Sequence, residues 1–208
     1  INYAVVGEEA AVATFDQALS SWFGNKLAAK KPLVTLLLGP PGHGKTYFSS
    51  NMARSLVGEK NYLFIACASI TSHPDLFGGD VGKGPSDGRL TSWLRTREGL
   101  DTVVFLDEFE KICESNSLGH ASKKKIMQTF LEPWQEGTLT DQSANSGANS
   151  ARGRRSDGVR GHMIDTSRTM WILTSNWGQQ TVIDFAQKHE KHVYKHIEEE
   201  DVAWIQAE

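Results

Sequence analysis

The string GPPGHGKT at residues 39–46 limits the possible folds of this chain more than any other segment. It lies between an apolar run at residues 33–38 and a stretch of helical spacing that begins at Tyr47. Its spacing, G-x-x-x-x-G-K-T, is that of a phosphate-binding loop, in which glycines let backbone N–H groups approach phosphate oxygens at the positive end of the next helix. The pattern therefore predicts a strand, a tight loop and a helix that together bind a nucleoside triphosphate.

Individual residues of this loop have expected roles. Lys45 is expected to reach the β- and γ-phosphates, and Thr46 to offer its hydroxyl to Mg²⁺, which prefers hard oxygen ligands. His43 occupies a variable position of the motif and is interpreted as tolerated there rather than catalytic. The alternative, a glycine-rich turn that ends in Lys-Thr by chance, is disfavoured by the flanking strand and helix patterns. The residues expected to contact the nucleotide here are Pro41, Gly42, His43, Gly44, Lys45, Thr46 and Tyr47.

A second motif, TVVFLDE at residues 102–108, ends an apolar run with two adjacent carboxylates. Such a run is typical of a buried parallel strand, and ligands of open α/β sheets bind at the carboxyl ends of the strands. Asp107 is expected to bind the nucleotide's Mg²⁺, and Glu108 to polarise the attacking water. The alternative is that both acids only cap the next helix. A complete phosphate-binding loop in the same chain favours the catalytic interpretation.

Length and composition indicate one domain with a substantial core, because 39% of the 208 residues are hydrophobic. The formal net charge of −3 argues against a general nucleic-acid surface. Cys67 and Cys113 are interpreted as buried free thiols, which suits a reducing compartment. No run is long and apolar enough to span a bilayer, so we expect no membrane partner. The free thiols lead us to expect an intracellular, cytoplasmic protein. Because the chain begins at Ile1 rather than Met, we interpret it as a fragment.

Apolar spacing predicts strands that alternate with helices, which is the pattern of a parallel sheet covered on both faces. Residues 143–161 lack apolar periodicity and are rich in Ser, Gly, Asn and Arg, so we predict a mobile loop that interrupts the domain without dividing it. The predicted strands are residues 33–38, 62–68, 102–107 and 170–174; the predicted helices are residues 10–23, a helix from Tyr47 to near Gly58, and helices through residues 90–94 and 126–134.

Two further groups of polar residues are candidates for function. Asn176 follows the last predicted strand, where it is expected to orient the lytic water or contact the γ-phosphate; the alternative is an ordinary turn residue or cap. His189, His192 and His196 share one face of a predicted helix, which suits a metal site. A solvated helix rich in Glu and Lys explains the same histidines without a metal, and we favour it.

With GPPGHGKT, VVFLDE and ILTSN in this order, the chain resembles the AAA+ ATPases, whose Walker A and Walker B motifs are the first two strings. Further strings resemble the Clp-type unfoldase and disaggregase branch: GRLT at residues 88–91, FLDEFEK at 105–111 and EGTLTD at 136–141. The string VVGEEAAV at residues 5–12 is similar to the family's V-I-G-Q-x-x-A-V. That similarity implies Val5, Val6 and Gly7 as contacts of the adenine.

The resemblance implies the large α/β subdomain of a P-loop NTPase, with a parallel five-stranded sheet flanked by helices. It also implies ATP and Mg²⁺ as ligands and a hexameric homo-oligomeric ring in which a neighbour completes each site. Residues 177–208 contain no arginine, so we expect the arginine finger and the C-terminal helical lid to lie beyond this fragment. An arginine finger contributes about 10³–10⁵ in rate, so an isolated fragment is expected to hydrolyse ATP slowly.

The chain departs from the Clp pattern at two further places. Where the branch has an aromatic pore loop, G-Y-V-G, residues 79–82 read GDVG, and Asp80 replaces the aromatic residue. Phe77 is the nearby aromatic substitute, although a Phe is more often a core anchor. Residues 143–161 carry Arg152, Arg154, Arg155 and Arg160, which suit contact with an acidic peptide or nucleic acid in a ring's channel, or a solvated loop.

These observations lead to one main hypothesis and two alternatives. The main hypothesis is a Mg²⁺-dependent ATPase in which Lys45, Glu108 and Asn176 are catalytic and whose ring remodels or unfolds polypeptides. The first alternative is a nucleotide-controlled assembly switch or scaffold with slow hydrolysis, because the pore aromatic is missing. The second, a nucleic-acid motor, rests on the arginine-rich loop alone, and nucleic acid is not our expected partner.

Overall fold

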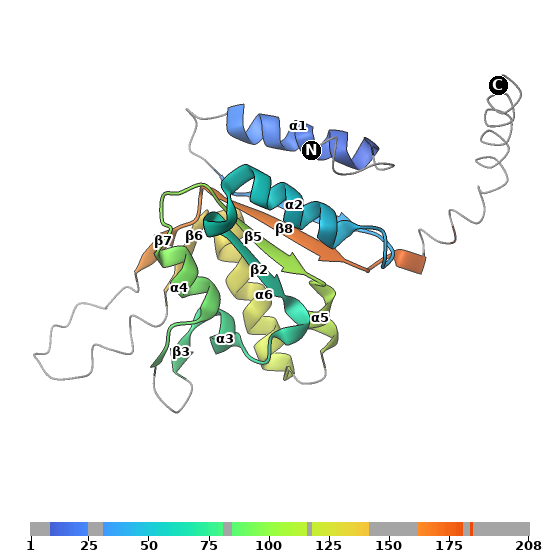
Figure 1. Cartoon of the computed structure of the whole chain (residues 1–208). Helices are drawn as coiled ribbons and strands as arrows, with labels where there is room; N and C mark the ends of the chain where they lie inside the picture. The colour runs from blue at the N-terminus through green and yellow to red at the C-terminus, as the bar shows by residue number, and fades with distance from the viewer. Residues whose placement is uncertain are drawn as a thin grey trace, which may run out of the picture.

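A four-stranded parallel sheet forms the centre of the part of the chain that the computed structural model describes (Figure 1). That part comprises residues 9–24, 31–80, 85–115, 118–141, 162–180 and 184. Every adjacent pair of strands is parallel, as the alternating sequence pattern predicts. In order across the sheet, the strands are β1 (Leu33–Leu38), β8 (Thr169–Ser175), β5 (Thr102–Asp107) and β2 (Tyr62–Ala66).

The predicted strands are confirmed, with differences in length at β2 and β8 and one difference in number. β8 extends one residue beyond the predicted range at each end. β2 ends at Ala66 rather than at residue 68, because the chain leaves the sheet through a short 3-10 helix, η2 (Cys67–Ser69). The resemblance implied five parallel strands, whereas the described residues contribute four to this sheet. The helix after the phosphate-binding loop, α2 (Lys45–Val57), begins two positions earlier than predicted and ends before Gly58 as predicted.

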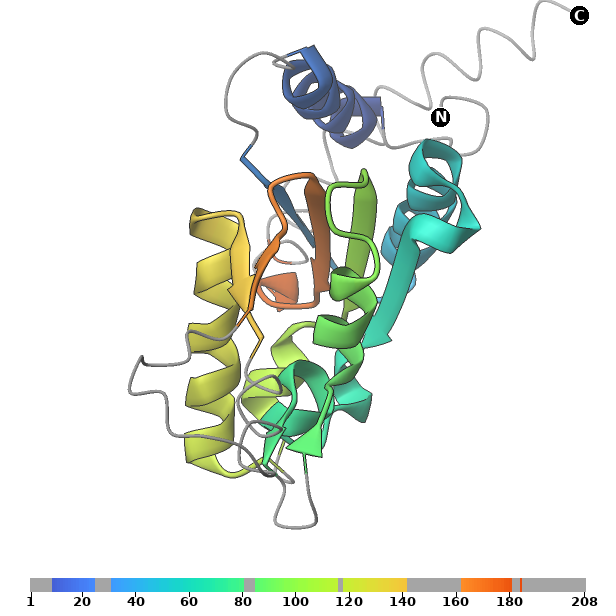
Figure 2. The same ribbon diagram turned by 90° about the vertical axis from the view of Figure 1, so that its left-hand side faces the viewer.

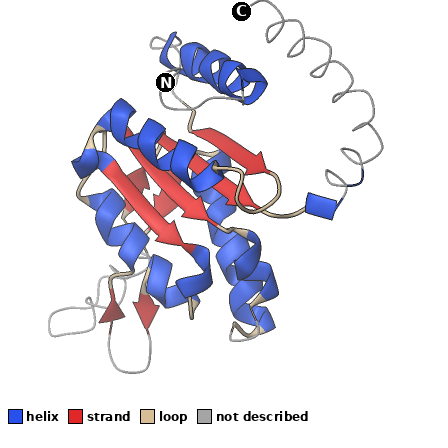
Figure 3. Ribbon diagram, turned by 45° about the vertical axis from the view of Figure 1, so that its right-hand side comes forward, coloured by secondary structure: helices blue, strands red, loops and turns tan. Residues whose placement is uncertain are grey.

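Helices cover both faces of the sheet, so its central strands are buried on either side (Figures 2 and 3). Along β5, Val103 and Phe105 pack against the face covered by α2, whereas Val104 and Leu106 point to the opposite face. This two-sided burial explains why the strand has a continuous apolar run. One face carries α1 (Glu9–Gly24) and α2; the other carries α3 (His73–Phe77), α4 (Arg89–Arg95), α5 (Glu110–Glu114) and α6 (His120–Gln135).

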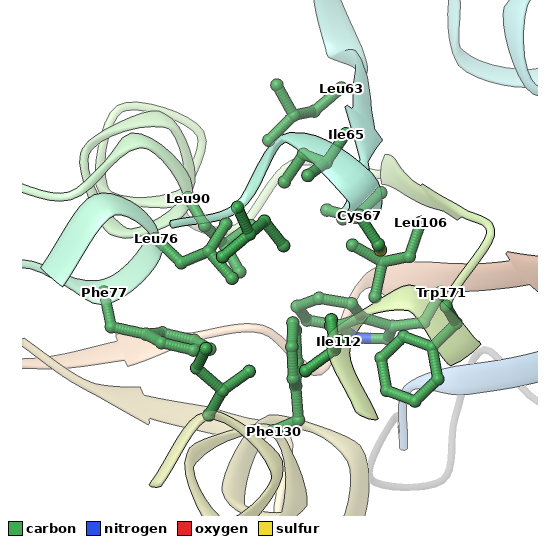
Figure 4. Close-up of a cluster of buried hydrophobic side chains, with 14 of the residues drawn as sticks. Leu63, Ile65, Cys67, Leu76, Phe77, Leu90, Leu106, Ile112, Phe130 and Trp171 are labelled. Carbon is green, nitrogen blue, oxygen red and sulfur yellow. The ribbon is translucent and has the colours of Figure 1, made fainter. Parts of the chain in front are cut away.

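Several aromatic rings pack against one another within the larger apolar cluster, which lies between the sheet and α3 to α6 (Figure 4). Phe77 is only 1% exposed, and its ring centroid lies 5.0 Å from that of Phe130. Phe130 in turn contacts Trp171 of β8 edge to face. Phe77 is therefore a core anchor, and the alternative that it replaces the pore aromatic is wrong, because its side chain is enclosed.

Two short antiparallel ladders extend from this core. The first pairs β3 (Gly79–Asp80) with β4 (Pro85–Ser86), so Asp80 lies in a hairpin strand beyond Phe77. The second pairs β6 (Thr138–Thr140) with β7 (Met163–Asp165). Beside this second ladder the buried carboxylate of Asp141 contacts the Arg95 guanidinium of α4 at 2.5 Å. The predicted loop at residues 143–161 lies outside the described residues and stays a prediction.

Other expectations have mixed outcomes. Cys67 is buried, whereas Cys113 is only half-buried; neither forms a disulfide. Among the described residues, no helix combines the length and apolarity needed to cross a membrane. His189, His192 and His196 lie outside the described residues, and within the described residues no three or more His, Cys, Asp or Glu side chains are grouped so that they could hold a metal ion.

Candidate nucleotide-binding site

The phosphate-binding loop connects the end of β1 to the first residue of α2, as the motif requires. Gly42 and Gly44 have φ angles of +83° and +74°, in the left-handed region that favours glycine. Gly44 is also the residue that precedes α2, and it supplies no side chain to cap the helix. Because the first N–H groups of a helix have no partner within the helix, they are available to an anion at this position.

Lys45 is bonded to the loop itself. Its Nζ donates to the carbonyl oxygens of Gly39 and Pro40, each at 2.7 Å, and to Oδ1 of Asn176 at 3.0 Å. These bonds use all the N–H donors of the ammonium group. Lys45 must therefore exchange carbonyl and amide partners for phosphate oxygens when an anion enters the loop.

Strand order brings the second motif to the same edge of the sheet. β8 lies between β1 and β5, and all these strands run in the same direction, so their carboxyl ends lie side by side. As a result, Thr46 Oγ1 donates to Asp107 Oδ1 at 2.9 Å across 61 positions of sequence. The same carboxylate oxygen accepts a second bond from Thr174 Oγ1 at 2.6 Å. A hydroxyl and a carboxylate thus converge below the loop, and both are hard oxygen donors.

Glu108 has an unusual backbone conformation. Its φ of +52° is the only positive φ of a non-glycine residue in the described part of the chain. The Glu108 N–H donates to Thr174 Oγ1 at 3.1 Å, and the Phe109 N–H donates to the Thr174 carbonyl at 2.9 Å. The side chain of Glu108 is exposed beside the loop, which leaves it accessible to a ligand or a water.

These residues surround a cavity of about 350 Å³. Every residue predicted from the loop lines it except His43, which is exposed and whose Nδ1 lies 3.0 Å from the Pro41 carbonyl. Asp107 lies behind this lining, in contact with Thr46. Val5, Val6 and Gly7 lie outside the described residues, so the predicted adenine contacts stay a prediction. The cavity is lined by Pro41, Gly42, Gly44, Lys45, Thr46, Tyr47, Glu108, Thr174, Ser175 and Asn176.

Glu110 and Thr174 belong to this site although the sequence did not single them out. Glu110 is 1% exposed, and its Oε1 accepts a bond of 3.0 Å from Nδ2 of Asn176. The amide of Asn176 is therefore held from both ends, by Glu110 and by Lys45. The available signal for Glu110 was a third acid directly after the Asp107–Glu108 pair, in the string DEFEK at residues 107–111. A hydroxyl near the end of an apolar strand was the corresponding signal for Thr174.

Cys67 lies near the acids of the site but is not a candidate nucleophile. Burial raises the pKa of its thiol, and the negative charges of Asp107, Glu110 and Glu108 raise that pKa further. The thiol therefore stays protonated at neutral pH, and only a thiolate is an effective nucleophile.

Residues 35–193 match the ATPase family associated with various cellular activities (AAA), and the chain belongs to this family. Curated relatives lie in the Clp branch, which the sequence resembles. The chain is 26% identical over 187 residues to the chaperone protein ClpB of Aquifex aeolicus. The aligned residues cover 86% of this chain and 16% of that protein.

Two further relatives extend this picture. The chain is 28% identical over 180 residues to the ATP-dependent Clp protease ATP-binding subunit ClpL of Lactococcus lactis. The aligned residues cover 84% of this chain and 20% of that protein. It is 32% identical over 136 residues to the ATP-dependent zinc metalloprotease FtsH of Slackia heliotrinireducens. The aligned residues cover 61% of this chain and 16% of that protein. The chain thus spans at most a fifth of the length of these relatives.

Proposed function

We propose that this chain binds ATP with Mg²⁺ in the cavity below the phosphate-binding loop and hydrolyses the terminal phosphate. The observation that carries the proposal is the contact of Thr46 Oγ1 with Asp107 Oδ1 at 2.9 Å, next to Lys45. It joins the two motifs at one point, where a cation bound to phosphate oxygens would need ligands. Membership of an ATPase family supports the same activity.

The residues of this site fit both ATP and Mg²⁺. A Cβ built on Gly42 or Gly44 meets no atom within 4 Å, so the space beside these two glycines is open to phosphate oxygens. The Thr46 hydroxyl and the Asp107 carboxylate are the hard oxygen donors that Mg²⁺ prefers. When bound, Mg²⁺ neutralises phosphate charge that would otherwise oppose attack by water.

Each residue then has a defined task. Lys45 transfers its N–H donors from the loop carbonyls to the β- and γ-phosphates, and this transfer releases Oδ1 of Asn176. Glu108 accepts a proton from the attacking water, whereas Asn176 orients that water or contacts the γ-phosphate. Asp107 and Thr46 would hold the Mg²⁺ that accompanies the phosphates.

We further propose that the full-length protein couples hydrolysis to the remodelling or unfolding of polypeptides in a homo-oligomeric ring. The relatives named as chaperones support this extension. The experiment is ATP turnover by the full-length parent protein, with and without Mg²⁺ and with and without an unfolded polypeptide. We expect turnover to need Mg²⁺ and to rise with the polypeptide.

The variant Glu108→Gln provides the test of the proposed base. It is expected to bind ATP as the unsubstituted protein does and to lose turnover by about 10²–10⁴-fold, the contribution of a positioned general base. Normal binding with unchanged turnover would show that Glu108 is not the base. Turnover without Mg²⁺ would contradict the proposed roles of Thr46 and Asp107.

A nucleotide-controlled assembly switch is the second candidate, and the burial of Phe77 favours it. Because Phe77 is enclosed and Asp80 takes the aromatic position of the pore loop, the described part of this hairpin offers no aromatic grip for a threaded polypeptide. Oligomerisation that follows ATP binding, with turnover indifferent to polypeptide, would support the switch over the remodelling machine.

A further inference from the structure

One residue, Thr174, contacts the backbone or side chain of both acids at the end of β5. It lies near the carboxyl end of β8 and is only 1% exposed. Its Oγ1 donates to Asp107 Oδ1 at 2.6 Å and accepts from the Glu108 N–H at 3.1 Å. Its carbonyl oxygen accepts from the Phe109 N–H at 2.9 Å. Thr174 thus bonds to the peptide groups on both sides of the Glu108 Cα.

This pair of bonds coincides with the place where the ladder between β5 and β8 ends. The last paired residues are Leu106 and Leu173, after which a regular ladder would continue at Asp107 and Thr174. Instead the chain turns at Glu108, where φ is +52°. The Thr174 hydroxyl takes the place of a backbone acceptor for the Glu108 N–H.

The conformation of Glu108 needs this external support. A left-handed backbone costs a non-glycine residue about 1–2 kcal/mol, and such residues persist where surrounding bonds hold them. A regular extended residue at position 108 would alternate its side chain to the opposite face of the strand from Asp107. The turn instead leaves the Glu108 side chain at the edge of the cavity that Lys45 lines.

We propose that Thr174 is a positioning residue for hydrolysis, which holds Glu108 in its left-handed conformation and orients the Asp107 carboxylate. The inference rests on the proposed ATPase function. Thr174 itself need not touch the reacting atoms, because its hydroxyl hydrogen is used by Asp107 and its lone pair by the Glu108 N–H.

The test compares Thr174→Val, which keeps the shape but removes the hydroxyl, with Thr174→Ser, which restores it. We expect Thr174→Val to lower kcat for ATP by about 10–100-fold, as the loss of supporting bonds around a site does, while the Kd for ATP changes by less than about threefold. Thr174→Ser is expected to recover most of kcat. Thr174→Ala provides the same comparison if the valine variant does not fold.

Thr169→Val is the matched control. Thr169 lies on the same strand, is 2% exposed, and its Oγ1 shares a 3.0 Å hydrogen bond with Thr102 Oγ1 at the opposite end of the sheet. This variant removes a buried hydroxyl of the same kind from the same strand. We expect a comparable fall in the melting temperature and an unchanged kcat.

The outcomes separate this inference from the proposed function. If Thr174→Ser is as slow as Thr174→Val, or if Thr169→Val slows turnover equally, the Thr174 hydroxyl has no positioning role. If Glu108→Gln abolishes turnover but Thr174→Val does not change it, the function stands and the inference fails. If Glu108→Gln leaves turnover intact in the same assay, the assignment of the base fails first.

Discussion

The two ends of the parallel sheet are built differently although the same strands form both. At the amino end, Thr102 and Thr169 satisfy each other's hydroxyls, and Arg168 donates to both carboxylate oxygens of Asp101. At the carboxyl end, the backbone of Glu108 is left-handed, and Oε2 of the buried Glu110 has no hydrogen-bond partner in the part of the chain that the structure describes. The amino end pairs these side chains with each other, although Thr166 Oγ1 is buried there without a hydrogen-bond partner among the described residues, whereas the carboxyl end combines a left-handed backbone with a buried unpaired carboxylate oxygen.

This difference indicates where stability and function compete in the molecule. Strained backbone and unsatisfied buried acceptors cost free energy and are concentrated at functional sites. Self-satisfied pairs such as Thr102 with Thr169 contribute to folding without offering chemistry. Substitutions at the carboxyl end should therefore change activity more than stability, and substitutions at the amino end should do the reverse.

The largest expected effect is at Glu108. We expect Glu108→Gly to lower ATP turnover by about 10²–10⁴-fold, because the proposed general base is lost. The same variant should raise the free energy of unfolding by about 1 kcal/mol, because glycine adopts a positive φ without strain. Urea denaturation and a turnover assay measure the two effects, with Glu108→Ala as the control that loses the base and keeps the strain. A glycine variant less stable than the alanine variant would contradict the prediction that the backbone at Glu108 is strained.

The next largest effect is expected at Lys45. Lys45→Ala should weaken ATP binding by about 100-fold, because charge-assisted hydrogen bonds contribute about 1.5–3 kcal/mol each. Titration calorimetry measures the change directly. The control is Lys60→Ala, in the 3-10 helix η1 (Glu59–Asn61) that precedes β2 at the amino end of the sheet. Equal losses in both variants would show a general charge effect rather than a specific phosphate contact.

A pH titration tests stability away from both ends. Burial, and secondarily the charge of Lys125, lowers the pKa of His73 from its ordinary 6.5 to about 4. The unfolded chain therefore binds a proton first as the pH falls, so His73 should lower stability progressively from pH 6.5 to about 4. Well above pH 6.5 the histidine is neutral in both states, and its effect on stability is absent.

The control for this titration is His73→Gln, compared with the unsubstituted protein by urea denaturation at each pH. The glutamine variant should lose less stability than the histidine protein over the same interval, because its side chain does not titrate. Parallel curves for the two proteins would show that His73 is not responsible for acid sensitivity in this range.

The smallest effect is expected at the amino end. Arg168→Ala removes a bidentate contact with Asp101 at 2.8 and 3.0 Å, but both side chains are more than a third exposed. Such a pair contributes below about 1 kcal/mol, and salt screens it. Thermal unfolding at low and high salt should show a small difference that shrinks with salt, with turnover unchanged. A large loss of turnover would break the proposed division between the two ends.

Local sequence pattern was sufficient for the four central strands, for α1, α2, α4 and α6 and for most of the cavity, but it did not predict α3, α5 or the two antiparallel ladders. The apolar run at residues 102–107 predicted a strand buried on both faces, and β5 is such a strand. The spacing of glycines, Lys45 and Thr46 predicted the loop, because that motif encodes the backbone geometry over consecutive residues. The placement of Asp107 and Asn176 followed from one rule, that parallel strands present their carboxyl ends at a common edge.

Contacts between residues far apart in the sequence could not be predicted from local sequence pattern. Thr174 meets Glu108 across 66 positions of sequence, and its register depends on how β8 pairs with β5. The enclosure of Phe77 depends likewise on Phe130, which another helix brings against it.

Residue type and spacing therefore specify the family's loop, its acids and its strands, since these depend on neighbours along the chain. Tertiary packing decides three other features: the left-handed turn at Glu108, the hydrogen bonds of Thr174 and the orientation of Asn176. Each depends on strands and helices that are far apart in the sequence and lie side by side in the fold. A hydrogen bond needs its two atoms within a narrow range of distance and angle. Folding alone supplies that geometry when the two residues are far apart in sequence.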